Sequence, residues 1–189
     1  MKPAVSLSPE RLVTRLGRQR GSEAGLVNVL VHRASTIVFD SVAELEAAKK
    51  NRFGKGELFY ARFGTPDVFA FEQAVADLEG GFGGIAVPSG LAACVLPPVA
   101  FLQTGDHVLV TDSVYEPARS SLQEFIARSG VEVTFYDPTI GAGIASLLKS
   151  NTRMVYTDTP GSLTFEIQDL PAISAAAHAH GALVVCDNT

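Results

Sequence analysis

Tryptophan is absent from the chain, and cysteine and methionine each occur only twice among its 189 residues. With so few cysteines, and with Cys94 and Cys186 far apart in apolar runs, the sequence predicts neither a disulfide framework nor a cysteine-rich metal site. Both are expected to be small core residues. The histidines also lack metal-ligand spacing, because His178 and His180 lie two residues apart on a predicted helix and face different directions. We assign no metal.

Long hydrophobic runs and clusters of basic charge are also lacking. The 15 Lys and Arg residues are interspersed among 20 Asp and Glu, with a net charge of -5, so the sequence offers no surface for nucleic acid or an anionic membrane. No stretch has the roughly 18 apolar residues of a membrane span. The basic residues up to Arg20 are not followed by the apolar segment of a secretory signal. We expect a cytoplasmic protein whose partners are small molecules and other subunits.

A hydrophobic content of 47% and a charged content of 19% are typical of a globular protein with a sizeable core. Residues 1–64 are predicted to form an irregular N-terminal arm. Within it, Ser41 and Glu44 have the spacing of a capping box, which predicts a short helix. Regular patterning begins at Thr65, where a helix is predicted to run as far as Gly80.

After that helix, strands and helices alternate along residues 65–189. Apolar runs predict strands at 85–87, 107–111, 131–136, 154–157 and 183–187, and helices are predicted at 91–102, 117–128, 143–149 and 171–180. This rhythm predicts an α/β fold with a mostly parallel sheet covered by helices on both faces. The chain stops at Thr189, directly after the last predicted strand. We therefore expect residues 65–189 to be the first part of an α/β domain that is truncated at its C-terminus.

Candidate chemistry is expected at the carboxyl ends of the strands, where parallel sheets bind ligands. The turn at Ser89, Gly90 and Leu91 enters a predicted helix, whose first amides could bind a phosphate. Taken alone, such a turn is more often an ordinary helix cap. Tyr115 lies in the loop after strand 107–111, where its ring could stack on a planar cofactor or pack the loop.

Two further polar positions have similar alternatives. Asp187 ends an apolar strand, where a carboxylate needs a partner. A protonated ring nitrogen would provide one, and a helix-capping role is equally compatible with the sequence. Arg62, next to Tyr60 in a predicted loop, could grip a phosphate with its planar guanidinium or could simply be solvated.

Taken together, these segments resemble the Cys/Met-metabolism family of enzymes that depend on pyridoxal 5'-phosphate (PLP). The resemblance extends from about Arg15 to the end, and the matching segments occur in the same order and at similar intervals. They are Tyr60-Ala61-Arg62-Phe63-Gly64-Thr65-Pro66, Leu78-Glu79-Gly80-Gly81, Pro88-Ser89-Gly90, Gly105-Asp106-His107-Val108-Leu109, Tyr115-Glu116-Pro117, Thr159-Pro160-Gly161-Ser162 and Val185-Cys186-Asp187-Asn188-Thr189. The implied fold is the large domain of a PLP-dependent transferase of fold type I, like that of aspartate aminotransferase.

The resemblance also implies roles for the candidate residues. Ser89, Gly90 and Leu91 would bind the PLP phosphate through backbone amides and the serine hydroxyl. Tyr115 would stack on the pyridine ring and assist proton transfer. Asp187 would pair with the protonated ring nitrogen, which keeps the ring an effective electron sink.

In the family, the residues that match Tyr60 and Arg62 reach the phosphate of a neighbouring subunit. The resemblance therefore implies a homodimer with shared active sites, usually within a homotetramer. Residues 1–64 would then also be a subunit-contact segment.

Within the family, Tyr115-Glu116-Pro117 and Phe135-Tyr136-Asp137-Pro138 resemble the cystathionine β-lyase branch. The γ-synthases and γ-lyases, which remain the alternative, typically have Tyr-Gly-Gly at the first of these places. The implied reaction converts L-cystathionine or a related thioether to homocysteine, pyruvate and ammonia, in transsulfuration and methionine biosynthesis. Two conservative departures are Asp158, where the family commonly has glutamate, and Thr159, where it has serine.

The resemblance also implies a lysine that holds PLP as a Schiff base, at a position beyond Asp187-Asn188-Thr189. The chain ends before this position, and before the C-terminal arginine that binds the substrate carboxylate. No lysine of the chain follows a matching motif, so we nominate no substitute; the lysines are Lys2, Lys49, Lys50, Lys55 and Lys149. A non-catalytic fragment, which binds PLP weakly or associates with full-length subunits, is therefore the alternative from another functional class.

Overall fold

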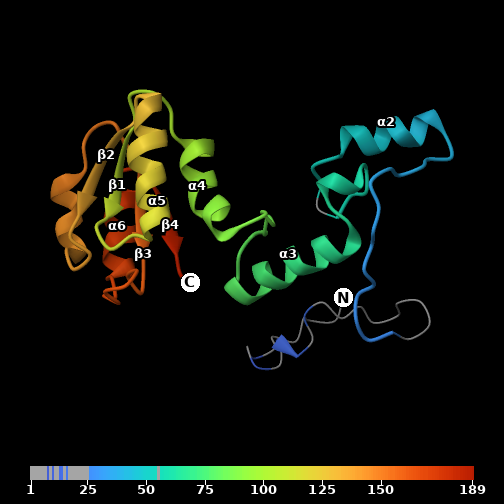
Figure 1. Ribbon diagram of the computed structural model, residues 1–189, viewed down its shortest axis with the longest axis horizontal. Coiled ribbons are helices and arrows are strands. Elements are labelled where there is room, and N and C mark those ends of the chain that lie inside the picture. The colour runs from blue at the N-terminus through green and yellow to red at the C-terminus, as the bar shows by residue number, and fades with distance from the viewer. Residues whose placement is uncertain (1–7, 9, 11–12, 15, 17–25, 55) are drawn as a thin grey trace. The chain divides into compact units, whose positions relative to one another are not determined.

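A computed structural model describes residues 8, 10, 13–14, 16, 26–54 and 56–189 of the chain (Figure 1). Most of the expected arm up to residue 25 lies outside the described residues. The chain divides into two compact units, residues 1–86 and residues 87–189. The division at residue 64 that the sequence predicts stays a prediction.

The first unit contains short helices joined by loops: α2 (Val42–Lys50), the 3-10 helix η2 (Ala61–Phe63) and α3 (Pro66–Glu79). The predicted helix and the serine half of the capping box are confirmed, because Oγ of Ser41 accepts a hydrogen bond from the Glu44 amide at 3.2 Å. Oε2 of Glu44 in turn accepts one from the Asp40 amide at 3.1 Å. The predicted end of α3 is also confirmed, with Gly80 in the left-handed conformation at φ 62°.

The second unit is built on a parallel four-stranded sheet with the order β2-β1-β3-β4. Its strands are β1 (His107–Thr111), β2 (Glu132–Tyr136), β3 (Thr152–Asp158) and β4 (Leu183–Asp187). Its helices are α4 (Gly90–Phe101), α5 (Glu116–Ser120), the π-helical turn η3 (Ser121–Ile126), and then η4 (Ala127–Ser129), η5 (Gly141–Leu147) and α6 (Leu170–Ala179). No helix among the described residues is long and apolar enough to cross a membrane.

Each face of this sheet is covered by helices (Figure 1). On one face, strand residues that include Val108, Val110 and Tyr156 pack against Leu122 and Ile126 of η3. On the other, a second buried cluster joins the strands to η5 and α6 through Leu109, Val155, Ile144, Ile173 and Ala177. The two-sided burial explains why the central strands are continuously apolar, as the sequence predicted.

Two local predictions are wrong, and a third differs only in its bounds and helix type. Residues 85–87 are not a strand: the Ile85 side chain is 81% exposed, and the Ala86 amide donates to Oε1 of Glu72 instead of to a neighbouring strand. The helix predicted at residues 143–149 is present as the 3-10 helix η5, with its bounds shifted to residues 141–147. Cys186 is exposed rather than in the core, because β4 is the edge strand of the described sheet.

Candidate cofactor-binding site

The N-terminus of α4 has the properties of an anion site. Ser89 is its N-cap, and the serine Oγ accepts a hydrogen bond from the Ala92 amide at 3.2 Å. The amides of Gly90 and Leu91 belong to the first turn, whose donors have no partner within a helix and carry partial positive charge. A Cβ at Gly90 would meet no atom within 4 Å, so the space beside this first residue of the helix is open. A phosphate group fits here.

Asp187, the last residue of β4, presents a half-buried carboxylate with both oxygens hydrogen-bonded. Oδ1 accepts bonds from the backbone amide and hydroxyl of Thr189, at 3.0 and 2.7 Å. Oδ2 accepts a bond from the thiol of Cys94 at 3.3 Å. Burial acts to raise the pKa of Asp187, but the bonds from Thr189 and Cys94 outweigh it, so the pKa lies below the ordinary carboxyl value. The carboxylate is therefore ionised at neutral pH.

Cys94 connects this carboxylate to the anion site. It lies four residues after Gly90 on α4, which is about one helical turn or ~5.4 Å along the axis. The residue of α4 that contacts Asp187 is therefore about one turn from the first amides of the helix. Burial raises the pKa of the Cys94 thiol, and the charge of Asp187 raises it further, so the thiol stays protonated and donates. From the sequence, Cys94 was predicted only to be a core residue, and no pattern indicated its contact with Asp187.

Tyr115 is joined to the same edge of the sheet by a hydrogen bond to Asp158. The tyrosine directly precedes α5, its side chain is 43% exposed, and its backbone amide donates to Oδ2 of Asp158 at 2.8 Å. Asp158 is the last residue of β3 and pairs in register with Asp187 of β4. Burial raises the pKa of Asp158, and the charge of Asp187 acts in the same direction.

The loop between β3 and α6 is fixed by buried polar groups. The amide group of Gln168 donates to the Asp158 carbonyl at 2.7 Å and accepts from the Tyr136 hydroxyl at 3.0 Å. Burial raises the pKa of Tyr136 far above its ordinary value, so the hydroxyl remains a donor. The Ser162 amide also donates to the Ser113 carbonyl at 2.8 Å. The role of Gln168 could not be predicted from the sequence, because a lone glutamine in a loop carries no pattern.

The structure thus connects α4, the backbone of Tyr115 and Asp187 through contacts of Cys94 and Asp158 near the carboxyl ends of β3 and β4. Tyr60 and Arg62 belong to the first unit, where the Arg62 guanidinium carbon lies 5.1 Å from the centroid of the Tyr60 ring. The predicted action of these two residues on a neighbour's phosphate stays a prediction.

Within the second unit, no lysine that the structure describes lies beside Asp187. Lys149 is the lysine of that unit, and its Nζ contacts Glu132 at the amino end of β2, the opposite edge of the sheet. Lys49 and Lys50 are in α2 of the first unit. Lys2 and Lys55 lie outside the described residues.

With this geometry established, comparison with known proteins identifies the family: the family "Cys/Met metabolism PLP-dependent enzyme" matches residues 10–189. The chain belongs to this family. It is 46% identical over 177 residues to a putative cystathionine beta-lyase of Rhizobium johnstonii, covering 94% of this chain and 43% of that protein. It is 41% identical over 188 residues to the cystathionine beta-lyase of Escherichia coli, covering 97% of this chain and 47% of that one. The chain thus spans about half the length of the curated relatives it matches.

Solved structures of the Cys/Met-metabolism PLP family agree on the fold. The crystal structure of cystathionine gamma-lyase from Lactobacillus plantarum, complexed with L-serine, superposes with a TM-score of 0.83 at 26% identity. The alignment covers 97% of this chain and 45% of that one. The predicted fold class, the PLP-binding α/β domain of fold type I, is confirmed.

The donor set fits the family's cofactor. An anion site, a half-exposed aromatic ring and an ionised carboxylate match the phosphate, the flat ring and the ring nitrogen of PLP, respectively.

Proposed function

We propose that this chain forms the cofactor-binding part of a PLP-dependent carbon-sulfur β-lyase acting on L-cystathionine or a related thioether amino acid. The observation that carries the proposal is the hydrogen bond between the ionised Asp187 and Cys94, which lies about one helical turn after the first amides of α4. When bound, PLP supplies an electron sink for charge that develops at the substrate's α-carbon. The β-lyase reaction is supported by the names of the relatives at 46% and 41% identity. The Tyr115-Glu116-Pro117 segment favours it over a γ-synthase or γ-lyase.

Each residue of the site then has a distinct task. The amides of Gly90 and Leu91 bind the phosphate, with Ser89 holding the first turn of α4 in place. Asp187 accepts a hydrogen bond from the protonated ring nitrogen, and the charge-assisted bond favours the protonated form. Tyr115 lies over the ring face and assists proton transfer at the α-carbon.

For the 189 residues on their own, we propose cofactor binding without turnover. Removal of the α-proton needs a base beside the cofactor, and Lys149 lies at the opposite edge of the sheet. The family resemblance implies that the lysine of the active enzyme lies beyond Asp187-Asn188-Thr189, and we propose the same for the group that binds the substrate carboxylate.

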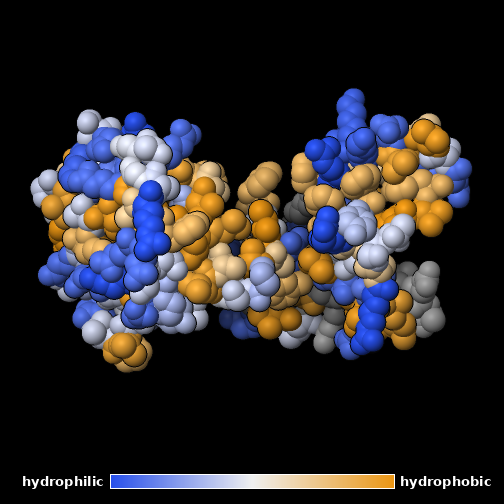
Figure 2. All heavy atoms as spheres, turned by 45° about the horizontal axis from the view of Figure 1, so that its top comes forward, coloured by the Kyte–Doolittle hydropathy of each residue, from blue (hydrophilic) through white to orange (hydrophobic). Residues whose placement is uncertain are grey.

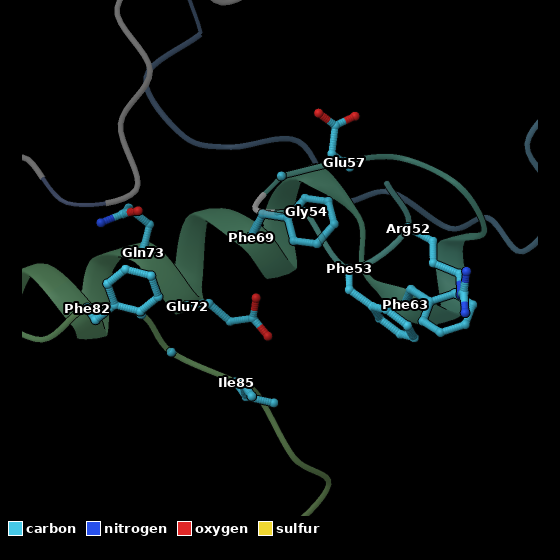
Figure 3. Close-up of a pocket in the computed structure, with 13 residues that line it drawn as sticks. Arg52, Phe53, Gly54, Glu57, Phe63, Phe69, Glu72, Gln73, Phe82 and Ile85 are labelled. Atoms are coloured by element: carbon cyan, nitrogen blue, oxygen red, sulfur yellow. The ribbon is translucent and has the colours of Figure 1, made fainter. Parts of the chain in front are cut away.

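A second copy of the chain is the proposed partner, and the cytoplasm the proposed compartment. The first unit exposes apolar side chains, including Phe53 at 76%, Phe71 at 61%, Phe82 at 104% and Ile85 at 81%, and Figure 2 shows hydrophobic surface on this unit. Four phenylalanines, among them Phe53 and Phe82, line a cavity of about 680 Å³ in the same unit (Figure 3). Patches of this kind mark protein interfaces. In such a homo-oligomer, Tyr60 and Arg62 would reach a neighbour's phosphate.

Binding of pyridoxine 5'-phosphate to the purified chain tests the site, because this alcohol keeps the ring and phosphate but cannot react with lysines. We expect the change Asp187→Asn to weaken binding by about tenfold, the worth of a charge-assisted hydrogen bond. Asp137→Asn is the matched control: Asp137 lies just after β2, and its Oδ1, like that of Asp187, accepts from the amide and hydroxyl of a threonine two residues on.

Two results would contradict the proposal. Absence of pyridoxine 5'-phosphate binding by the unaltered chain would remove the cofactor site. Release of pyruvate from cystathionine by the 189 residues with PLP would mean that a lysine of this chain serves in catalysis. Sedimentation of the chain as a monomer at all concentrations would separately contradict the homo-oligomer.

A further inference from the structure

Asp158 accepts a hydrogen bond that has no part in the proposed binding of the cofactor's phosphate or ring nitrogen. Its side chain is only 6% exposed, and its Oδ2 accepts the hydrogen bond from the Tyr115 amide at 2.8 Å. A buried carboxylate is costly unless it is hydrogen-bonded. The partner is a backbone group 43 residues earlier in the chain, so the bond joins two segments that sequence alone does not connect.

This bond fixes the backbone at Tyr115. The residue has φ -46° and ψ 125°, outside the helical region, and its side chain makes no capping hydrogen bond. A second tie reinforces the first, because the Ser162 amide donates to the Ser113 carbonyl. Gly161 lies so close to Ser113 that a Cβ on this glycine would be 2.7 Å from the serine Cβ. The loop that carries Tyr115 is thus held against the end of β3 at two points.

Asp158 also stands beside Asp187. The two acids are register partners at the ends of β3 and β4, and the Thr159 amide donates to the Asp187 carbonyl at 3.0 Å. Asp158 therefore links the position of the Tyr115 backbone to the position of the Asp187 carboxylate.

We propose that Asp158 is a positioning residue, which sets the Tyr115 ring relative to Asp187 so that both meet one flat ring. This inference rests on the proposed function, in which the face of a pyridine ring meets Tyr115 and its nitrogen meets Asp187. Asp158 itself touches neither the ring nor the substrate; it acts through Tyr115.

The test measures binding of pyridoxine 5'-phosphate and of inorganic phosphate to the full chain and to four variants. Asp158→Ala removes the acceptor, Asp158→Asn keeps an oxygen acceptor, Tyr115→Leu removes the aromatic ring, and the fourth combines Asp158→Ala with Tyr115→Leu. Induced circular dichroism of the bound pyridoxine ring reports its orientation, and far-UV circular dichroism reports folding. Asp158→Ser, whose hydroxyl is too short to reach the amide, replaces Asp158→Ala if the latter does not fold.

We expect Asp158→Ala to weaken pyridoxine 5'-phosphate binding by about tenfold and to diminish the induced signal, with Asp158→Asn within about threefold of the unaltered chain. The double variant should bind no worse than Tyr115→Leu alone, because residues that act through one another are not additive. Binding of inorganic phosphate should be unchanged throughout.

Additive losses in the double variant, or an equal loss of inorganic phosphate binding in Asp158→Ala, would overturn the inference while leaving the cofactor site intact. Failure of the unaltered chain to bind pyridoxine 5'-phosphate would instead overturn the proposed function and this inference with it.

Discussion

The thiol of Cys94 lies 3.3 Å from Oδ2 of Asp187, so a hydrogen-bond donor from α4 meets the acid at the end of β4. The contact has an electrostatic consequence for each partner. It helps to keep the pKa of the Asp187 carboxyl low, and the carboxylate in turn contributes to the raised pKa of the Cys94 thiol. A change at either residue should therefore alter the pKa of the other.

Alkylation of Cys94 tests this coupling. In a Cys186→Ser background, which leaves one thiol, Asp187→Asn removes a negative charge and should lower the pKa of Cys94. More thiolate is then present at a fixed pH of about 8, so iodoacetamide should react several-fold faster, as followed by mass spectrometry. Burial, the larger cause of the raised pKa, remains in the variant. An unchanged rate, equal to that of the Asp137→Asn control, would show that the thiol does not sense Asp187.

Two helix caps offer a matched pair of variants. Oγ of Ser89 accepts from the Ala92 amide in α4, and Oδ1 of Asp169 accepts from the Ala172 amide in α6. Ser89→Ala and Asp169→Ala should each lower the free energy of unfolding by about 1 kcal/mol, as measured with denaturant. Only Ser89→Ala should weaken binding of inorganic phosphate, because only α4 carries the anion site. Equal phosphate binding in both variants would argue against that site.

The buried ring of His107 should make the free energy of unfolding depend on pH. The ring is fully buried, its nitrogens lie 2.7 and 2.9 Å from the hydroxyls of Thr152 and Thr134, and burial followed by the charge of Lys149 lowers its pKa below 6.5. The unfolded chain then binds the proton more readily than the folded one. The stabilisation is complete above pH 6.5 and is lost as the pH falls below that value.

Comparison of His107→Gln with the unaltered chain isolates this effect. The free energy of unfolding of the unaltered chain should fall between pH 6.5 and 5 with an added slope of at most about 1.4 kcal/mol per pH unit. The variant should lack this part of the slope, whereas His178→Gln, at an exposed position, should keep it. Parallel curves for all three proteins would mean that His107 is not held neutral.

Substitutions at Gly105 and Gly130 should distinguish the free-energy cost of backbone strain from that of steric crowding. Both have positive φ, 91° and 84°, and the Gly105 amide donates to the Gly130 carbonyl. A Cβ at Gly105 meets open space, whereas one at Gly130 would lie 2.7 Å from Cγ2 of Thr104, whose hydroxyl is bonded to Ser129. Gly105→Ala should cost about 1–2 kcal/mol in unfolding free energy, and Gly130→Ala at least about 1 kcal/mol more. Equal losses in thermal unfolding would mean that Thr104 moves aside freely.

The sequence predicted those parts of the fold that local patterns encode. Strands 107–111 and 183–187 were predicted with the bounds that the structure has, because each is an apolar run bounded by a glycine turn and a polar residue. Residues 85–87 look similar, but a strand also needs a neighbour to pair with, and pairing is not a local property. The same reason hides the bond between Cys94 and Asp187, which are 93 residues apart and meet only because α4 packs on the sheet. Ser89 could be predicted from its capping turn before a helix, Tyr115 from its loop after β1, and Asp187 from its place at the end of β4.

The register of β4 against β3 pairs Asp187 with Asp158. Side chains along a strand alternate between the two faces of a sheet, so a slip of β4 by a single residue would carry the carboxylate of Asp187 away from α4 and toward the face that α6 covers. The candidate site therefore depends on the pairing of β4 with β3 as much as on the residues that form it.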